Sequence, residues 1–176
     1  MKIAEIKSFI ETCEGLVIEI AGPTLHGYSF MKENDITMPS RLIVTNVSKK
    51  IHVWNRVKNL MELHRVDDVA DSINLPYGDN SVSILFVSNL SITASHGSEA
   101  INAAKHEYMN PLRPTTNLHL FLYKEALRVL VHHGLIIQVG AFVEDLSAFS
   151  GYMFTKEYLS TKGEGTLILR KISKLV

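Results

Sequence analysis

The sequence predicts an α/β fold with a doubly wound, mainly parallel sheet. Short runs that are apolar on both faces alternate with segments of helical periodicity, a pattern typical of strands joined by right-handed crossovers. The first such run, Leu16–Ile20, ends at the breaker cluster formed by residues 21–24. The chain has 176 residues, 46% of them hydrophobic, so it can bury a core, and we expect one domain over residues 1–176.

Further elements are expected wherever these two patterns recur. The other predicted strands are residues 42–45, 66–70, 82–87 and 135–139, with a final strand within 163–169 that forms an antiparallel hairpin with a short strand near Tyr152. Helices are predicted where apolar residues recur every three or four positions, over residues 3–10, 53–61 and 117–130. We expect Asn117 to cap the last helix and Gly134 to end it.

Composition narrows the class of protein. Lys and Arg (18) balance Asp and Glu (18), so the basic surplus of a nonspecific nucleic-acid binder is missing, and we expect no nucleic-acid partner. Cys13 is the only cysteine, which excludes an internal disulfide, and the eight histidines lack the spacing of a metal site. No apolar run approaches the roughly 20 residues that span a bilayer, and residues 1–15 are unlike a signal peptide. We therefore expect a soluble cytoplasmic protein with no membrane partner.

Three segments carry a recognisable motif. Residues 69–82 read VADSINLPYGDNSV, residues 125–137 read EALRVLVHHGLII, and residues 17–22 read VIEIAG. They resemble, in turn, the D-x-x-x-LP-aromatic-x-D-x-S-aromatic segment, the E-x-x-RVL-x-x-GG helix-to-strand junction, and the first strand with its glycine loop of class I S-adenosylmethionine-dependent methyltransferases. The nearest group is the small-molecule enzymes that include quinone-biosynthesis C-methyltransferases. The resemblance implies a Rossmann-like sheet of this family's type, with S-adenosylmethionine as the cofactor.

The resemblance also implies roles for residues that follow the strands. Gly22 would let the backbone approach the methionine part of the cofactor. Glu19 would organise that loop near the methionine amino group, the alternative being a solvated strand-end carboxylate. Asp71 would accept a hydrogen bond from the adenine amine, with Ser72 beside the base, the alternative being a turn-forming aspartate. Ser88, at the end of the fourth strand, completes the proposed cofactor contacts.

The chain departs from the family pattern at several positions. The acidic residue that grips the ribose hydroxyls is missing after the second strand, where Asn46 or Ser48 could bond a hydroxyl without charge. A charged hydrogen bond contributes about 1.5–3 kcal/mol against about 0.5–1.5 for a neutral one, so we expect roughly tenfold weaker cofactor binding. Pro23 follows the first glycine of the loop, and Ser83 replaces a family aspartate. These changes fit either a divergent enzyme or a decayed one.

The function predicted from these observations is methyl transfer to a small-molecule or carrier-bound acceptor. No spacing singles out a general base, so the catalytic residue stays unassigned. The candidates are Ser88, Asn89, His96, His106, Glu107 and Tyr108. The alternative is a catalytically idle methyltransferase-like domain that serves as a binding or partner subunit. A nicotinamide dehydrogenase would need a triple-glycine fingerprint and a following acidic residue, and the sequence has neither.

Few residues remain to cover the acceptor. Only a short helix precedes Leu16, and few residues separate Val139 from the last strands. We expect the open side to carry an apolar patch that includes Tyr28, Phe30 and Met31, and a second copy of the chain to close it in a homodimer.

Overall fold

The computed structural model describes residues 3–24, 28–55, 57–88, 114–140, 154–160 and 165–172. Seven strands form one mixed sheet in the order β5-β2-β1-β6-β7-β9-β8. The strands are β1 (Leu16–Ile20), β2 (Leu42–Asn46), β5 (Asp68–Val69), β6 (Val82–Ser88), β7 (Leu130–Val139), β8 (Phe154–Ser160) and β9 (Thr166–Lys171). The pairs among β5, β2, β1, β6 and β7 are parallel, whereas β9 is antiparallel to both β7 and β8. The predicted α/β class with a mainly parallel sheet is confirmed, and an antiparallel pair ends the chain.

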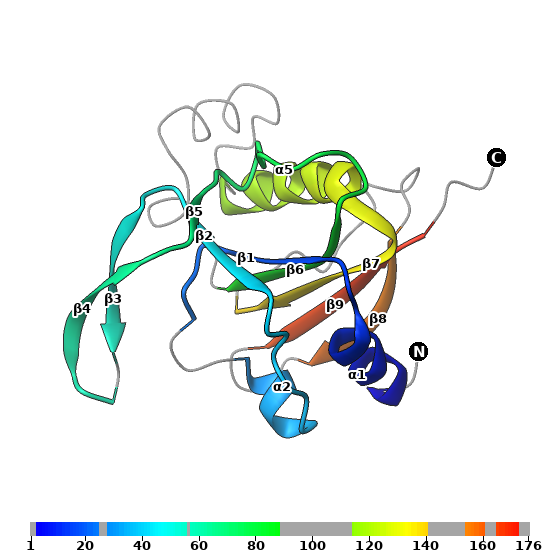
Figure 1. The fold of residues 1–176 in the computed structure, drawn as a ribbon, viewed down its shortest axis with the longest axis horizontal. Helices are drawn as coiled ribbons and strands as arrows, with labels where there is room; N and C mark the ends of the chain where they lie inside the picture. Colours follow the sequence, from blue (N-terminus) through cyan, green and yellow to red (C-terminus); the bar gives the residue numbers. More distant parts are fainter. Residues whose placement is uncertain are drawn as a thin grey trace.

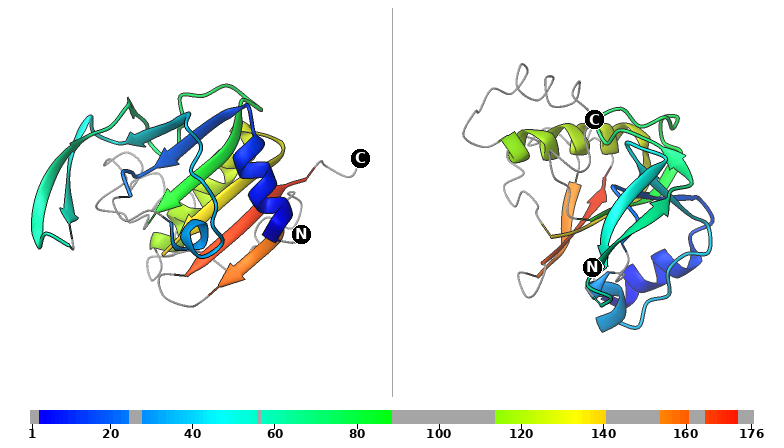
Figure 2. Two further views of the ribbon diagram at one scale, coloured as in Figure 1. Left: turned by 60° about the horizontal axis from the view of Figure 1, so that its bottom comes forward. Right: turned by 90° about the vertical axis from the view of Figure 1, so that its left-hand side faces the viewer.

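Helices cover both faces of the sheet (Figures 1 and 2). One face carries α1 (Ile3–Thr12) and α2 (Ser29–Glu33), and the other carries α5 (Pro114–Val129). Neighbouring residues of the central strands alternate between two buried clusters. Ile18 and Leu85 belong to the cluster beneath α5, and Val17 and Ile84 belong to the cluster beneath α1 and α2. Since side chains alternate along a strand, an apolar run buries both of its faces, which is why these strands lie at the centre of the sheet.

The predicted helix over residues 53–61 is wrong. This segment instead forms the antiparallel strands β3 (Lys50–Asn55) and β4 (Leu60–Arg65). The Asn55 side chain accepts hydrogen bonds from the amides of Val57 and Lys58 at 3.0 and 3.1 Å, and Asn59 takes a left-handed φ of 53°. These features turn the chain, so Val57 lies 85% exposed at the bend instead of on a buried helical stripe.

The predicted limits of the last helix also need correction. Helix α5 begins at Pro114, where proline suits a first turn, so Asn117 lies inside the helix and does not cap it. The helix ends at Val129, and the Lys171 ammonium donates to the carbonyls of Leu127 and Leu130, both at 2.6 Å. A cation that neutralises the last carbonyls takes the place of the predicted glycine cap.

Gly134 has a different role, within β7. The left-handed φ of 65° belongs to His133, and the pairing of β7 with β6 shifts between Val82 and Ile84. A Cβ on Gly134 would lie 3.0 Å from the carbonyl oxygen of Ser83, so the glycine permits close approach of the two strands.

The predicted apolar surface patch is wrong as well. Tyr28, Phe30 and Met31 are 1–2% exposed and belong to the cluster beneath α1 and α2. The short helix α2 folds these side chains onto the sheet, which buries the surface that we expected a second copy to cover. Within the described residues, no helix has the length and apolar character required to cross a membrane.

Candidate functional site

The carboxyl ends of β1, β2 and β5 meet at one edge of the sheet. The Gly22 amide donates to the Thr45 carbonyl at 3.0 Å, and the Ala70 amide donates to the Asn46 carbonyl at 3.0 Å. Strand β1 has β2 on one side and β6 on the other, so the chain order reverses between β1 and β6. Ligands of parallel sheets bind at such a switch point, beyond the carboxyl ends of the strands.

Glu19 holds the loop that follows β1. Its side chain is 3% exposed, and its Oε1 accepts hydrogen bonds from the Thr24 amide at 3.0 Å and the Tyr28 hydroxyl at 2.8 Å. Burial, followed by the charge of Glu19, raises the pKa of Tyr28 well above its usual value, so the hydroxyl stays protonated as a donor. Glu19 is therefore a buried organiser of the loop, and the solvated alternative does not hold.

Gly22 lies where a side chain could not be placed. A Cβ at this position would come within 2.7 Å of the Glu19 carboxylate and of Val44 Cγ1. The preceding residue, Ala21, has a left-handed φ of 61°. The groups that lie close to this glycine are the chain's own Glu19 and Val44.

Asn46 and Ser48 both bond within the chain. The Asn46 amide nitrogen donates to the Gly22 carbonyl at 2.9 Å, and its oxygen accepts from the Val47 amide at 2.8 Å. The exposed Ser48 hydroxyl donates to the Lys50 carbonyl at 3.0 Å. Asn46 thus ties the β1 loop to the end of β2, and its nearly buried amide retains one N–H and one acceptor lone pair beyond these bonds.

Asp71 and Ser72 follow the short strand β5. The Asp71 carboxylate accepts from the Ile73 amide at 3.2 Å, and its carbonyl accepts from the Asn74 amide at 3.0 Å. Asp71 therefore does form the turn that we considered as its alternative role. Ser72 is fully buried. The turn also positions a carboxylate one residue beyond Ala70, whose amide is bonded to the end of β2.

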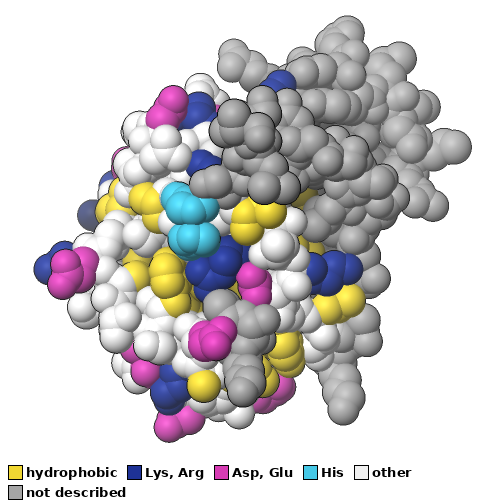
Figure 3. Space-filling view, turned by 90° about the vertical axis from the view of Figure 1, so that its right-hand side faces the viewer, with side chains coloured by type: hydrophobic (Ala, Val, Ile, Leu, Met, Phe, Trp, Pro, Cys, Tyr) yellow, Lys and Arg dark blue, Asp and Glu magenta, His cyan; other side chains and the backbone are white. Residues whose placement is uncertain are grey.

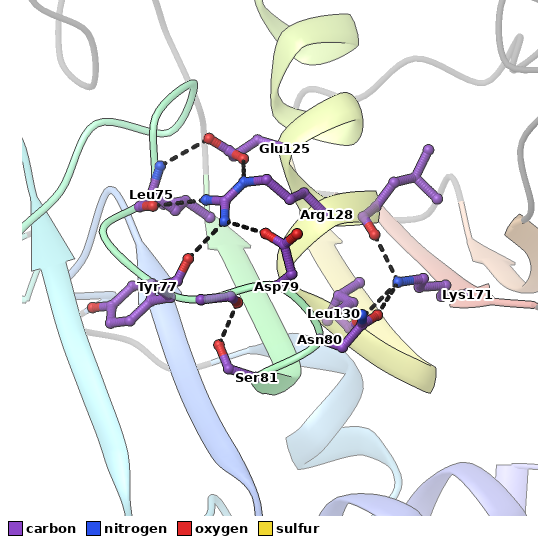
Figure 4. A network of polar contacts seen from close by, with 11 residues as sticks. Leu75, Tyr77, Asp79, Asn80, Ser81, Glu125, Arg128, Leu130 and Lys171 are labelled. Atoms are coloured by element: carbon purple, nitrogen blue, oxygen red, sulfur yellow. Dashed lines mark hydrogen bonds and ion pairs between the residues drawn. The ribbon is translucent and has the colours of Figure 1, made fainter.

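A clamp formed by Arg128 joins α5 to the loop after β5 (Figure 4). The guanidinium donates to the carbonyls of Tyr77 and Leu75, at 2.8 and 2.9 Å, and to the Asp79 carboxylate at 2.9 Å. It also pairs with Glu125, whose other oxygen accepts from the Leu75 amide at 3.1 Å. These acidic partners raise the pKa of Arg128. We call these five residues the Arg128 clamp.

The clamp joins two of the three segments that carry the family resemblance. Residues 75–79 belong to the first motif, and Glu125 and Arg128 belong to the second. Sequence reasoning gave these two residues no structural role. The signal available was a Glu and an Arg three positions apart on one helix face, but their partner loop, about fifty positions away, could not be identified from that spacing.

The remaining candidates lie partly or wholly outside the described residues. Ser88 ends β6, opposite Val139 of β7, and its side chain is not described. The other candidate general bases, Asn89 and the group at 96 and 106–108, fall outside the described ranges.

The opposite edge of the sheet holds a hollow of about 440 Å³, lined in part by Cys13, Gly15 and Arg41. Burial raises the pKa of the Cys13 thiol, which disfavours the nucleophilic thiolate. A Cβ on Gly15 would come within 1.9 Å of the Ser83 Oγ, so little room exists for the aspartate that the family has at position 83. This edge carries the amino ends of the parallel strands, and we place no cofactor site there.

The face shown in Figure 3 has histidines beside basic side chains. The rings of His132 and His133 lie 3.7 Å apart between centroids, and Arg170 donates to the His133 carbonyl at 2.9 Å. Burial, with help from these neighbouring charges, lowers the pKa of His133. Nowhere in the described part of the chain do three metal-ligating residues gather.

The donor and acceptor groups at the carboxyl edge suit the adenine of S-adenosylmethionine better than its ribose. A carboxylate at Asp71 suits the adenine amine, which is a donor. For the ribose hydroxyls, the described groups are Asn46, whose amide bonds Gly22 and Val47, and Ser48, whose hydroxyl bonds Lys50. No protein-family model matches the chain, and neither does any curated protein.

Proposed function

We propose that this chain is a methyltransferase-like domain that binds S-adenosylmethionine at the carboxyl ends of β1, β2 and β5 and transfers its methyl group to a small-molecule or carrier-bound acceptor. The Arg128 clamp is the observation that carries the proposal. It unites the Asp71 segment with the Glu125–Arg128 segment, so two motifs that resemble the family separately form one structural unit.

The sheet supports this proposal. The resemblance implies a doubly wound Rossmann-like sheet that ends in an antiparallel hairpin. The described sheet has helices on both faces, a reversal of strand order between β1 and β6, and an antiparallel pair of C-terminal strands.

In this proposal the bound cofactor supplies an electrophilic methyl group, and the protein binds and orients it. Asp71 accepts a hydrogen bond from the adenine amine, and the clamp holds the loop that follows Asp71. Glu19 holds the β1 loop near the methionine end through Thr24 and Tyr28. No described residue is assigned as a general base.

A binding domain without catalysis is the second candidate. One observation favours it: the space beside Gly22 is filled by the chain's own Glu19 and Val44, and the nearly buried Asn46 amide already bonds Gly22 and Val47. Weak ribose binding would lower cofactor affinity without preventing a role as a partner subunit.

Calorimetry with S-adenosylhomocysteine tests the cofactor site. We expect Asp71→Asn, which keeps the shape of the side chain but removes its charge, to weaken binding at least about tenfold, as the loss of a charged hydrogen bond implies. The matched control is Asp68→Asn, an exposed aspartate of β5 that bonds only its neighbouring Val69 amide among the described contacts. Equal affinities of the two variants would show that Asp71 does not bind adenine. Absence of binding by the unaltered chain would refute the cofactor proposal.

Small molecules released from the purified, denatured protein separate the two candidate functions. Copurified S-adenosylhomocysteine, identified by mass spectrometry, would support turnover. S-adenosylmethionine without its product would support the idle domain. Light scattering over a concentration series, with and without S-adenosylhomocysteine, tests the predicted homodimer.

A further inference from the structure

A two-stranded ribbon projects from the sheet at its carboxyl edge (Figures 1 and 2). We call residues 49–65, which contain β3 and β4, the arm. Its base is closed by the Val66 amide, which donates to the Lys49 carbonyl at 3.1 Å. No described side chain of the arm belongs to either buried cluster. A lone two-stranded ribbon is marginally stable in water, so this arm requires an explanation other than its contribution to the core.

One face of the arm combines cations with exposed apolar side chains. The strand register pairs Lys50 with Arg65 and His52 with Leu63, so these residues share a face, and Met61 shares it by alternation along β4. All five are exposed, Met61 at 52% and Leu63 at 57%. Large apolar side chains left in solvent between cations indicate a binding surface.

Positive charge is concentrated in the arm. The arm contains five of the chain's 18 Lys and Arg residues and one of its 18 Asp and Glu residues, so it carries +4 and the rest of the chain carries −4. Its only acid, Glu62, lies on the opposite face and pairs with Lys58 at 2.7 Å. Lys50 and Arg65 form no ion pair with another described residue. The balanced charge of the whole chain, from which we expected no nucleic-acid partner, conceals this separation.

We propose that the arm binds a single-stranded nucleic acid. Phosphates would lie against Lys50 and Arg65, and unstacked bases would cover Met61 and Leu63. A duplex would bury its bases and leave the apolar side chains without partners. A second copy of the same face would bring cations against cations, so the charge pattern favours a polyanion over self-association.

The arm also lies beside the proposed cofactor site. Strand β3 follows the carboxyl end of β2 by four residues, and Asn46, at that end, bonds the β1 loop through Gly22. The base of the arm therefore lies close to the edge that carries Asp71, whose neighbour Ala70 is bonded to Asn46. Binding of a strand by the arm does not rest on the proposed function, whose methyl acceptor is a small or carrier-bound molecule.

The test is fluorescence anisotropy with the full chain, without cofactor, and labelled RNA and DNA strands of about 15 nucleotides. The arm variant is Lys50→Glu with Arg65→Glu, and a second variant is Met61→Ser with Leu63→Ser. The matched control reverses one exposed arginine and one exposed lysine away from the arm, Arg41→Glu with Lys156→Glu. Circular dichroism checks that each variant is folded, which we expect because the arm lies outside both buried clusters.

We expect salt-dependent binding by the unaltered chain, at least about tenfold weaker binding by both arm variants, and a change within about twofold for the control. The charge reversal should also lower the slope of log affinity against log salt concentration by roughly 1.4, since each phosphate contact to a single strand contributes roughly 0.7.

Four results would overturn the proposal: no binding of either strand, equal loss in arm and control variants, preference for a duplex, or binding only to vesicles that contain phosphatidylserine. If the unaltered chain binds no oligonucleotide but forms a dimer, and the arm variants do not form that dimer, the arm mediates self-association instead. Failure of S-adenosylhomocysteine binding would leave these results unaffected, so the two proposals can fail separately.

Discussion

Replacing Arg128 by alanine should release the loop of residues 75–79 from α5. The guanidinium bonds two backbone carbonyls in this loop, pairs with Asp79 at its surface and pairs with Glu125 on its own helix. The Glu125 side chain is 11% exposed, whereas that of Asp79 is 71% exposed. The clamp therefore has one sheltered ion pair and one that solvent screens.

The expected loss follows from these exposures. The exposed pair with Asp79 contributes about 0–1 kcal/mol, and each carbonyl bond contributes about 1 kcal/mol. Removing the cation leaves a nearly buried Glu125 carboxylate that still accepts from the Leu75 amide, at a cost of about 1–2 kcal/mol after allowance for partial exposure. Arg128→Ala should therefore lower the free energy of unfolding by about 3–5 kcal/mol and the Tm by about 6–20 °C.

Urea denaturation measures this loss, and a double-mutant cycle with Glu125→Ala isolates the sheltered pair. We expect a coupling energy of about 1–2 kcal/mol for that pair and less than about 1 kcal/mol for the Arg128–Asp79 pair. Arg128→Lys should recover little, because an ammonium cannot donate in several fixed directions at once. A loss below about 1 kcal/mol for Arg128→Ala, or equal coupling to both acids, would refute the clamp as the element that holds this loop.

Three further changes test other parts of the structure. Leu130→Ala should lower the free energy of unfolding by about 2–5 kcal/mol, because this side chain is fully buried beneath α5, and a loss below about 1 kcal/mol would show that its packing is misassigned. Tyr28→Phe should cost about 1–3 kcal/mol in the same urea experiment by removing a donor from the buried Glu19 carboxylate; an unchanged midpoint would mean that this bond is not formed. Hydrogen bonds, chiefly from Asn55, lower the pKa of Glu62 from 4.5 to about 2, so its stabilising contribution is complete above about pH 4.5 and is lost as pH falls towards 2. An NMR titration of the Glu62 carboxyl should give this low midpoint, and Asn55→Ala should raise it; a midpoint near 4.5 in the unaltered chain would contradict the contact.

The bounds of β1, β2 and β6 were predicted within one residue, whereas β7 begins at Leu130, five residues before its predicted start. Strand β1 begins and ends where expected, and β2 and β6 each extend one residue further. An apolar run that buries both faces is a local property of the sequence, so its position in the chain can be recognised without knowledge of its neighbours. The same reasoning identified α1, in which Ile6 and Ile10 are buried.

The prediction of a helix in the arm was wrong because the same spacing of apolar residues can occur in a helix and in a hairpin. Val53 and Val57 recur at helical spacing, yet Asn55 and Asn59 lie between and beyond them and turn the chain back on itself. Residues Lys50–Asn55 form a strand because they pair with β4. The predicted helix over residues 53–61 instead placed the end of β3 and the start of β4 in one element. Asparagine is common in turns, so the two asparagines by themselves favour a hairpin over a helix.

The sequence by itself determined the α/β class, the order of the central strands along the chain and the segments that resemble a methyltransferase. The tertiary structure decided that Arg128 binds Leu75 and Tyr77, that Asn46 is bonded to Gly22, and that the arm's cations share one exposed face. The physical reason is the distance along the chain over which each effect acts. Periodicity and breakers act over a few residues, whereas hydrogen-bond partners are chosen by proximity in the folded chain, where residues far apart in sequence compete for the same donors and acceptors.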